Sequence, residues 1–350
     1  MHVHGIDHVE FYVADAHQVA AELCASYGFR IQGHADEADH RSVLLQQGDI
    51  QLVTTAGLTD EHPATAFVAA HGDGPATIAL RTDDPESALT EAVAAGAVPL
   101  LTAKPLAESA PPSQVRIAAF GDVAHTFVTR DELASRFIGG TRTPAEPLDM
   151  LDVLDHVAVC VPAGELGPTV RFYEDVLGFS KIFEEYIEVG AQAMNSQVVQ
   201  SPSGGVTLTL LEPDTTRMPG QIDEFLRAHD GAGVQHLALR TEDIAGTLRT
   251  LGARGVGFLT TPGSYFDELE RRLGHIGLPV DTLRELNILV DQDNEGELFQ
   301  IFAQSTHPRH TFFFEIIERR DALTFGSANI KALYEAVERE RASHGAGVSR

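Results

Sequence analysis

Alternating apolar and polar residues, and segments with helical spacing, recur in a fixed order along the chain. Residues 6–13 (IDHVEFYV) and 154–161 (LDHVAVCV) share one strand pattern, and each precedes a helical segment that ends at a Gly-Phe pair. A second pair of similar segments begins at 71 and 229 and predicts a strand, an acidic turn and an amphipathic helix. A unit of one strand, one helix and several strands therefore occurs four times, near 6–56, 75–130, 153–213 and 233–318.

The four βαβββ units predict an α+β fold made of two similar open-barrel domains. A single unit cannot close a barrel, whereas two units side by side form a cupped sheet whose interior can hold a ligand. Glycines and prolines among polar residues predict a linker at 131–150. We therefore expect an N-terminal domain at 1–130, a C-terminal domain at 151–350, and a terminal helix at about 327–342.

Charge and composition argue against several classes of partner. The 350 residues include 25 Lys and Arg against 51 Asp and Glu, so the formal net charge is −26 and no basic surface is available for nucleic acid or an anionic membrane. No apolar run reaches the roughly 18 residues that a membrane span needs, and the N-terminus lacks the pattern of a signal peptide. Two cysteines, Cys24 and Cys160, are too few for a disulfide scaffold, so a reduced, cytoplasmic setting is expected.

Three residues of the C-terminal half carry the candidate chemistry. His156, His236 and Glu315 each lie among apolar residues on one face of a different predicted strand. A carboxylate in the middle of an apolar strand is costly to bury unless it is paired or binds a metal. Two histidines and one carboxylate in one cup match the facial triad of non-haem Fe(II) oxygenases.

Each of these residues also has a simpler interpretation. A single histidine on a strand is more often a hydrogen-bonded core residue than a ligand, and Glu315 could face solvent at a sheet edge. The repeat favours the metal site, because His8 of the first half matches His156 whereas Thr77 stands where His236 stands. One copy of a duplicated cup would then keep its metal, while the N-terminal copy is degenerate and metal-free.

Four stretches of the chain carry a resemblance to a known family: GAGVQHLAL (231–239), ELFQIF (297–302), HPRHTFFFEIIER (307–319) and FGSANIKALYEAVE (325–338). With the βαβββ repeats, they resemble the vicinal oxygen chelate superfamily and, within it, the 4-hydroxyphenylpyruvate dioxygenase family, which includes 4-hydroxymandelate synthases. The resemblance covers essentially the whole chain. It implies that His156, His236 and Glu315 bind Fe(II), that O2 is a co-substrate, that the partner is a small 2-oxo acid, and that the chain forms a homodimer.

Three departures from the dioxygenase pattern resemble the synthase branch. Ile330 follows Asn329 where the dioxygenase has a phenylalanine on the substrate ring, although a neutral core substitution would look the same. TLLEP at 209–213 replaces Pro-x-Asn-Glu-Pro, and VGAQAMNSQVVQS at 189–201 also resembles the synthase. The expected reaction is decarboxylation and benzylic hydroxylation of 4-hydroxyphenylpyruvate to 4-hydroxymandelate, with homogentisate as the alternative product. The smaller Ile330 would let the ring tilt and expose the benzylic hydrogens.

The resemblance also implies a set of residues around the substrate. Gln300 shares the face of its apolar neighbours, whereas Gln235 has the opposite strand parity to His236 and needs a bulge or twist to reach the cavity. Gln221 is equally consistent with a surface residue at a helix start, and core packing explains Phe313 and Phe325 nearly as well. The residues expected at the substrate are Ser196, Thr209, Gln221, Gln235, Gln300 and Asn329, with Phe313, Phe325 and Ile330 near the reacting carbon.

Two other classes of protein share parts of this pattern. A metal-free binding module of the same superfamily would not need two histidines and a glutamate, and a stoichiometric iron assay separates it from an oxygenase. A ring-cleaving extradiol dioxygenase can have the same triad. Residues 307–319 and 325–330 favour a 2-oxo acid enzyme instead, and a test of catechol turnover would distinguish the two.

Overall fold

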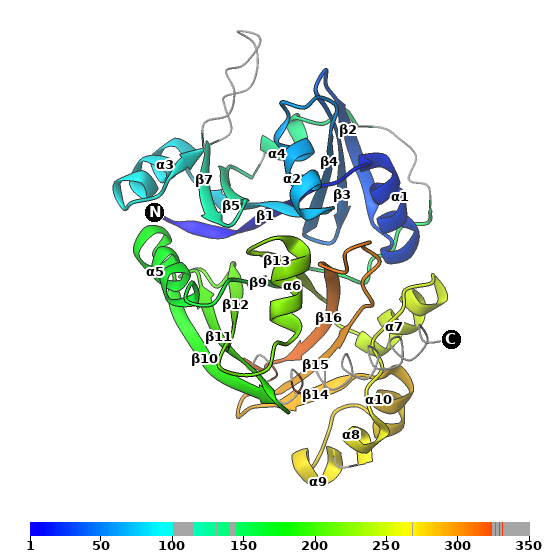
Figure 1. The fold of residues 1–350 in the computed structure, drawn as a ribbon. Coiled ribbons are helices and arrows are strands. Elements are labelled where there is room, and N and C mark those ends of the chain that lie inside the picture. The colour runs from blue at the N-terminus through cyan, green and yellow to red at the C-terminus, as the bar shows by residue number, and fades with distance from the viewer. Residues whose placement is uncertain are drawn as a thin grey trace, which may run out of the picture.

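The computed structural model describes residues 1–100, 115–130, 132–139, 145–267 and 269–323, with positions 326, 329 and 331. Two eight-stranded sheets, one in each half of the chain, are built from four βαβββ units (Figure 1), which confirms the predicted fold class. Of the predicted terminal helix at about 327–342, the described residues include only Asn329 and Lys331, both helical, while Phe325 and Ile330 lie outside them. No helix in the described ranges is long and apolar enough to cross a membrane.

The N-terminal sheet has the strand order β2-β3-β4-β1-β5-β8-β7-β6. Two βαβββ units meet where β1 and β5 pair antiparallel, and a further helix, α2, connects the units. The elements of this half are β1 (Val3–Tyr12), α1 (Ala16–Tyr27), β2 (Arg30–Asp36), β3 (His40–Gln47), β4 (Ile50–Gly57), α2 (Pro63–His71), β5 (Gly74–Thr82), α3 (Pro85–Ala94), β6 (Pro99–Leu100), β7 (Val115–Phe120), β8 (Val123–Val128) and α4 (Glu132–Ser135).

The C-terminal sheet repeats this order as β10-β11-β12-β9-β13-β16-β15-β14. Here β9 and β13 pair antiparallel at the centre, and three short helices are inserted before β14. The elements are β9 (Leu154–Cys160), α5 (Leu166–Leu177), β10 (Ser180–Val189), β11 (Gln192–Gln200), β12 (Thr207–Pro213), α6 (Gln221–His229), β13 (Gly233–Arg240), α7 (Ile244–Ala253), α8 (Gly263–Asp267), α9 (Leu269–Leu273), α10 (Val280–Leu286), β14 (Leu289–Gln292), β15 (Glu297–Phe302) and β16 (Phe313–Arg320).

The two halves share one buried core. Val9 on β1 and Val157 on β9 belong to the same apolar cluster and are fully buried. His125 and Tyr173 join the halves, because the Tyr173 hydroxyl lies 2.9 Å from Nε2 of His125. One face of each central strand is thus used for packing, and the alternate residues, among them His8 and His156, are left to line the two cups.

β-Bulges interrupt the alternation of side chains at corresponding places in both halves. Asp7 on β1 and Asp155 on β9 are each an extra residue in the pairing with the neighbouring central strand. Ala76 on β5 and Gln235 on β13 are extra residues in the same pairs. A bulge bends the strand and re-aims the side chains beside it. The structure therefore contains the bulge that strand parity requires if Gln235 is to reach the cavity.

Side chains of the protein itself fill the N-terminal cup. Leu133 of α4 lies in one buried cluster with Leu44 of β3. Glu10 is half-buried there and accepts a hydrogen bond from the Thr55 hydroxyl at 2.7 Å. Burial would raise the pKa of Glu10, but the nearby positive charge of Arg116 and the Thr55 bond lower it. Hydrogen-bonded polar side chains and apolar packing thus occupy the space that the C-terminal cup leaves open.

Two glycines at corresponding helix ends are expected to differ in how much stability their replacement by alanine costs. Gly28 ends α1 and Gly178 ends α5, both in the left-handed region with φ of 78° and 70°. A Cβ at Gly28 would lie 2.4 Å from Cγ of Leu148, whereas one at Gly178 meets nothing within 4 Å. We expect Gly178→Ala to lower the free energy of unfolding by about 1–2 kcal/mol through backbone strain.

Gly28→Ala should cost about 1–3 kcal/mol more than Gly178→Ala, because the side chain of Leu148 must also move. Urea denaturation of the two variants measures this difference directly. Equal losses of stability would show that the contact between Gly28 and Leu148 does not matter.

Candidate active site

His156 on β9, His236 on β13 and Glu315 on β16 converge inside the C-terminal cup. Oε2 of Glu315 lies 3.4 Å from Nε2 of His156 and 3.2 Å from Nε2 of His236. All three side chains are buried, and their ligand atoms lie within 4.8 Å of one another, so together they could hold a metal ion. Glu315 does not face solvent at a sheet edge, since it is 2% exposed.

Small residues on the neighbouring strands make room for the three ligands. Ala238 on β13 pairs with His156 on one side and with Glu315 on the other. Ala158 on β9 pairs with His236. A larger side chain at either alanine would stand between the groups that converge, so the register of the three strands and the two alanines together define the site.

The residue before each histidine sets the orientation of its ring. Oδ1 of Asp155 accepts a hydrogen bond from Nδ1 of His156 at 2.8 Å, and Oε1 of Gln235 accepts one from Nδ1 of His236 at 3.2 Å. Both preceding residues are the bulged ones. Because Nδ1 is used in these bonds, Nε2 is the nitrogen of each ring that faces Glu315 and is available to a metal ion, as a metal site needs.

The cluster holds a proton when no metal is bound. Burial would lower the pKa of His156, but hydrogen bonds to Asp155 and Glu315 raise it to about 9. Burial would raise the pKa of Glu315, but the neighbouring rings of His156 and His236 lower it to about 2. Burial also lowers the pKa of His236, so this histidine is the neutral one. The protonated ring of His156 thus supplies the positive charge beside Glu315 that a metal ion would otherwise supply.

The donor set fits a divalent transition metal. Two neutral imidazole nitrogens and one carboxylate are the ligands of the facial triad, which leaves coordination positions open. Oε1 of Glu315 is buried and has no hydrogen-bond partner among the described residues. An ionised carboxylate oxygen without a partner is costly in a protein interior, and a bound cation would remove that cost.

A cavity with about 560 Å³ of empty space, part of it open to solvent, lies over the triad. Oγ1 of Thr209, Nε2 of Gln221 and Oε1 of Gln300 are buried there without a hydrogen-bond partner in the described part of the chain. Six lining residues were not among those predicted from the sequence: Met194, Leu211, Leu298, Phe302, Ile317 and Arg319.

The predicted substrate residues fall into two groups. Thr209, Gln221, Gln235 and Gln300 line the cavity together with the triad. Ser196 is buried on β11 and pairs with the lining residue Leu211, but it is not itself part of the lining.

Asn329 and Phe313 lie beside the cavity. Oδ1 of Asn329 accepts a hydrogen bond from the Tyr265 hydroxyl at 2.9 Å, and Asn329 is not part of the lining. The ring of Phe313 stacks on that of His236, with centroids 5.0 Å apart, and so supports this ligand from behind. Phe325 and Ile330 lie outside the described residues.

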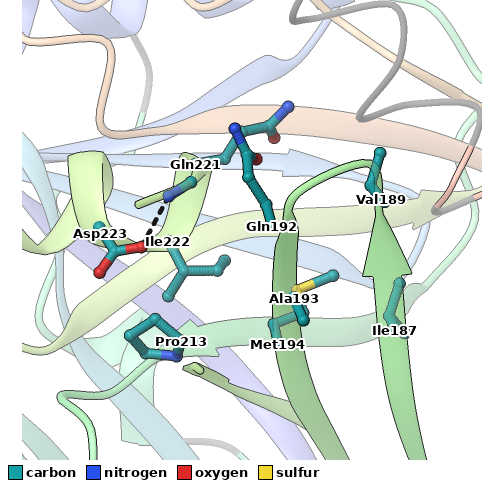
Figure 2. Close-up of a pocket in the computed structure, with 10 residues that line it drawn as sticks. Ile187, Val189, Gln192, Ala193, Met194, Pro213, Gln221, Ile222 and Asp223 are labelled. Atoms are coloured by element: carbon teal, nitrogen blue, oxygen red, sulfur yellow. Dashed lines mark hydrogen bonds between the residues drawn. The ribbon is translucent and has the colours of Figure 1, made fainter. Parts of the chain in front are cut away.

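The start of α6 brings Gln221 into the cavity. Gln221 is the first residue of this helix and is 9% exposed, which excludes the alternative of a surface residue. Oδ2 of Asp223 accepts a hydrogen bond from the backbone of Gly220 at 2.7 Å and fixes the start of the helix (Figure 2). A smaller pocket next to the cavity shares Met194 and Gln221 with it (Figure 2), so these side chains lie between the two spaces.

A buried ion pair next to His156 was missed by sequence analysis. Nε of Arg319 donates to Oδ2 of Asp155 at 2.7 Å, and Nη2 of Arg319 donates to Oδ1 at 2.9 Å. Arg319 has the same strand parity as Glu315, which is the one sequence signal that could have placed it at the cup. Nothing in the sequence shows that it reaches Asp155 on β9.

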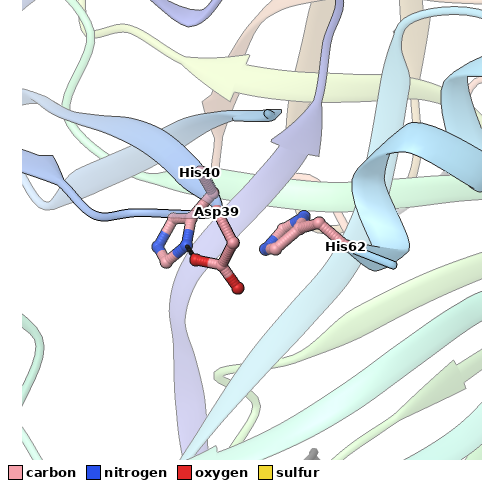
Figure 3. A group of neighbouring side chains, drawn as sticks. All are labelled: Asp39, His40 and His62. Carbon is pink, nitrogen blue, oxygen red and sulfur yellow. Dashed lines mark hydrogen bonds and ion pairs between the residues drawn. The ribbon is translucent and has the colours of Figure 1, made fainter. Parts of the chain in front are cut away.

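Asp39, His40 and His62 form a second group with metal-ligand atoms, near the N-terminal cup (Figure 3). One nitrogen of each histidine is already engaged: Asp39 accepts a hydrogen bond from Nδ1 of His40 at 2.8 Å, and Nδ1 of His62 accepts one from the backbone of Ala64 at 3.2 Å. Since Nδ1 of His62 is an acceptor, its other nitrogen carries the proton. A metal there would disrupt the cap of α2, so we assign none.

Two protein-family models match this chain, one in each half. The model of the glyoxalase/bleomycin resistance protein/dioxygenase superfamily matches residues 153–271, and that of the N-terminal part of hydroxyphenylpyruvate dioxygenase matches residues 1–133. The fold is thus that of the glyoxalase/bleomycin resistance protein/dioxygenase superfamily.

Individual relatives show to which family within this superfamily the chain belongs. A 4-hydroxyphenylpyruvate dioxygenase of Dictyostelium discoideum is 33% identical over an alignment 372 residues long, gaps included. The alignment covers 97% of this chain and 99% of the relative. The 4-hydroxyphenylpyruvate dioxygenase of Yarrowia lipolytica is 31% identical, and the match covers 97% of this chain and 93% of the relative. The solved structure of a mutant 4-hydroxymandelate synthase from Streptomyces coelicolor is 42% identical with a TM-score of 0.87, and the match covers 97% and 100% of the two chains. The chain belongs to the 4-hydroxyphenylpyruvate dioxygenase family.

The proton on the cluster makes metal binding depend on pH. Below about pH 9 a divalent ion must displace the proton from His156. We therefore expect the Kd of the metal-free protein for Co²⁺ to fall about tenfold for each unit of pH between pH 6 and 8, since one proton leaves per ion bound. Competition titrations with a chelator of known affinity measure this slope. A Kd that does not change over this range would contradict the protonated state of His156.

Proposed function

We propose that this chain is an Fe(II)-dependent oxygenase that converts 4-hydroxyphenylpyruvate and O2 into 4-hydroxymandelate and CO2. The observation that carries the proposal is the buried cluster of His156, His236 and Glu315 beneath a cavity with unpaired polar groups. Membership of the 4-hydroxyphenylpyruvate dioxygenase family supports iron as the metal and a 2-oxo acid as the substrate.

Some side chains of the site would bind the metal, and others would bind the substrate. His156, His236 and Glu315 would hold Fe(II) on one side and leave its other positions free for ligands. Iron held in this way supplies the activation of dioxygen and of the 2-oxo acid that no side chain offers. The substrate would satisfy the three orphaned polar groups of the cavity wall: Nε2 of Gln221 can donate a hydrogen bond, and Oε1 of Gln300 can accept one from a phenol hydroxyl.

Apolar side chains would orient the ring and exclude water. Met194, Leu211, Leu298 and Phe302 line the same cavity as the polar groups. They form a wall on which an aromatic ring can pack, with its hydroxyl and its carboxylate directed toward opposite polar ends. Exclusion of water strengthens the hydrogen bonds that fix the ring and protects a reactive intermediate state from side reactions.

The choice of 4-hydroxymandelate over homogentisate is supported by sequence likeness. The chain is 42% identical to a 4-hydroxymandelate synthase structure and 33% identical to the Dictyostelium dioxygenase. Ile330 and the TLLEP segment at 209–213 also resemble the synthase. The two products differ in whether the ring or the benzylic carbon is oxidised, and a shift of about 1 Å in the ring can decide between them.

Incubation of the Fe(II)-loaded protein with 4-hydroxyphenylpyruvate in air tests the proposal. We expect 4-hydroxymandelate as the main product, separated from homogentisate by retention against standards, because the two have the same mass. Ile330→Phe should raise the fraction of homogentisate, since a larger side chain limits the tilt of the ring. Homogentisate from the unaltered protein would instead identify a 4-hydroxyphenylpyruvate dioxygenase, and an unchanged product ratio in the variant would exclude a role for Ile330.

Gln300 provides a separate test of how the substrate binds. Gln300 is 3% exposed, and its Oε1 has no partner among the described residues. We expect Gln300→Leu to raise the KM for 4-hydroxyphenylpyruvate by about tenfold or more, because a substrate hydroxyl would then be buried without a partner. The Kd for Co²⁺ should stay unchanged, since Gln300 does not touch the triad. An unchanged KM would show that Gln300 does not contact the substrate.

A further inference from the structure

The two candidate metal-binding histidines have unequal support. Nδ1 of His156 donates to a carboxylate, Asp155, whereas Nδ1 of His236 donates to the neutral amide of Gln235. The hydrogen bond on the His156 side is also the shorter, at 2.8 Å against 3.2 Å. A bond to a carboxylate is charge-assisted and fixes a ring more firmly than a bond to an amide. His156 is therefore the better anchored of the two.

Arg319 holds Asp155 in place through two parallel hydrogen bonds. The side chains of Asp155 and Arg319 are 9% and 16% exposed, so the pair lies within the protein. A third donor of Arg319, Nη1, bonds to the backbone oxygen of Ala322 at 3.3 Å. The planar fork of an arginine fixes the plane of the carboxylate, which a lysine cannot do. The orientation of Asp155, and through it the ring of His156, is thus set by Arg319.

The ion pair also connects two strands that are not neighbours. In the sheet, β13 lies between β9, which carries Asp155 and His156, and β16, which carries Glu315 and Arg319. The hydrogen bonds between Arg319 and Asp155 therefore join the two outer ligand strands directly. This contact opposes any slippage that would separate His156 from Glu315.

We propose that Arg319 and Asp155 form a positioning clamp that holds His156 in the geometry for metal binding, so that the affinity of the site for its metal depends on this ion pair. The inference rests on the proposed function, because it assumes that the triad binds a metal. Both residues act through the ring of His156, as partners behind metal-binding histidines do in general.

The N-terminal half contains a natural comparison for the clamp. Asp7 is bulged like Asp155, and its Oδ1 accepts a hydrogen bond from Nδ1 of His8 at 2.8 Å. The strand register places Thr77 and Thr126 where the other half has His236 and Glu315, so this half lacks the triad. Asp7 forms no salt bridge with an arginine among the described residues.

Asp7→Asn is therefore a matched control for Asp155→Asn. Both substitutions replace a buried carboxylate that bonds to the next histidine of a bulged central strand. Both remove a charge from a structurally equivalent place, and both are expected to affect folding stability. Only Asp155→Asn changes a residue behind the triad.

The test measures metal affinity of the full chain after the metal has been removed with a chelator. Competition titrations with Co²⁺ at one pH are made for the unaltered protein and for Asp155→Asn, Arg319→Lys and Asp7→Asn, and thermal unfolding of each metal-free protein is recorded alongside. We expect Asp155→Asn to raise the Kd by about 10- to 100-fold. Arg319→Lys should raise the Kd by a smaller factor, because it keeps the charge and loses the fork. Asp7→Asn should leave the Kd within about twofold of the unaltered protein.

Two results would overturn the clamp. One is a Kd for Co²⁺ that is unchanged in both Asp155→Asn and Arg319→Lys. If Asp155→Asn does not fold, an unchanged Kd in Arg319→Lys alone overturns the clamp. The other is a loss of affinity in Asp7→Asn as large as that in Asp155→Asn, which would mean that stability rather than ring position controls binding. If the unaltered protein binds no metal, the proposed function is wrong and the clamp with it, an outcome that is distinct from the other two.

Discussion

The C-terminal half is arranged around the ionised carboxylate of Glu315 in the apolar middle of a sheet. A lone carboxylate there would cost several kcal/mol of desolvation, so it persists only with partners of opposite charge or a bound cation. Nε2 atoms of His156 and His236 lie within hydrogen-bonding reach and lower the pKa of Glu315 to about 2. Ala158 and Ala238 leave space for this contact, and the bulges before the two histidines turn their rings toward it.

The same scaffold occurs twice in the chain and is used in two ways. Both sheets have the same strand order and share two bulges in their central strand pair. In the N-terminal half, Glu10 accepts a hydrogen bond from Thr55, Arg116 donates one to Thr77, and Leu133 packs into the cup. In the C-terminal half, Oγ1 of Thr209, Nε2 of Gln221 and Oε1 of Gln300 in the cavity wall have no hydrogen-bond partner among the described residues. Duplication thus gave one cup that contributes packing and one that is available for chemistry.

Periodicity in the sequence predicted the repeated units, the two sheets and the three residues of the triad, because strand parity assigns side chains to one face of a sheet. Parity also showed that Gln235 requires a bulge, which the structure contains. The ion pair of Asp155 and Arg319 could not be predicted, since it joins non-adjacent strands 164 positions apart in the sequence. Periodicity gives the face of a residue but not which residues of distant strands meet. The same limit applies to Ser196, which has the right face and yet does not line the cavity.

The most direct test of this arrangement is the position of iron in crystals of the Fe(II)-loaded protein, found by anomalous X-ray scattering at the iron absorption edge. We expect one iron per chain, bound by Nε2 of His156, Nε2 of His236 and the carboxylate of Glu315, and no iron in the N-terminal cup. Iron bound only elsewhere, for example at Asp39, His40 and His62, would contradict the assignment of the metal centre. So would a fully loaded crystal in which the triad remains free of metal.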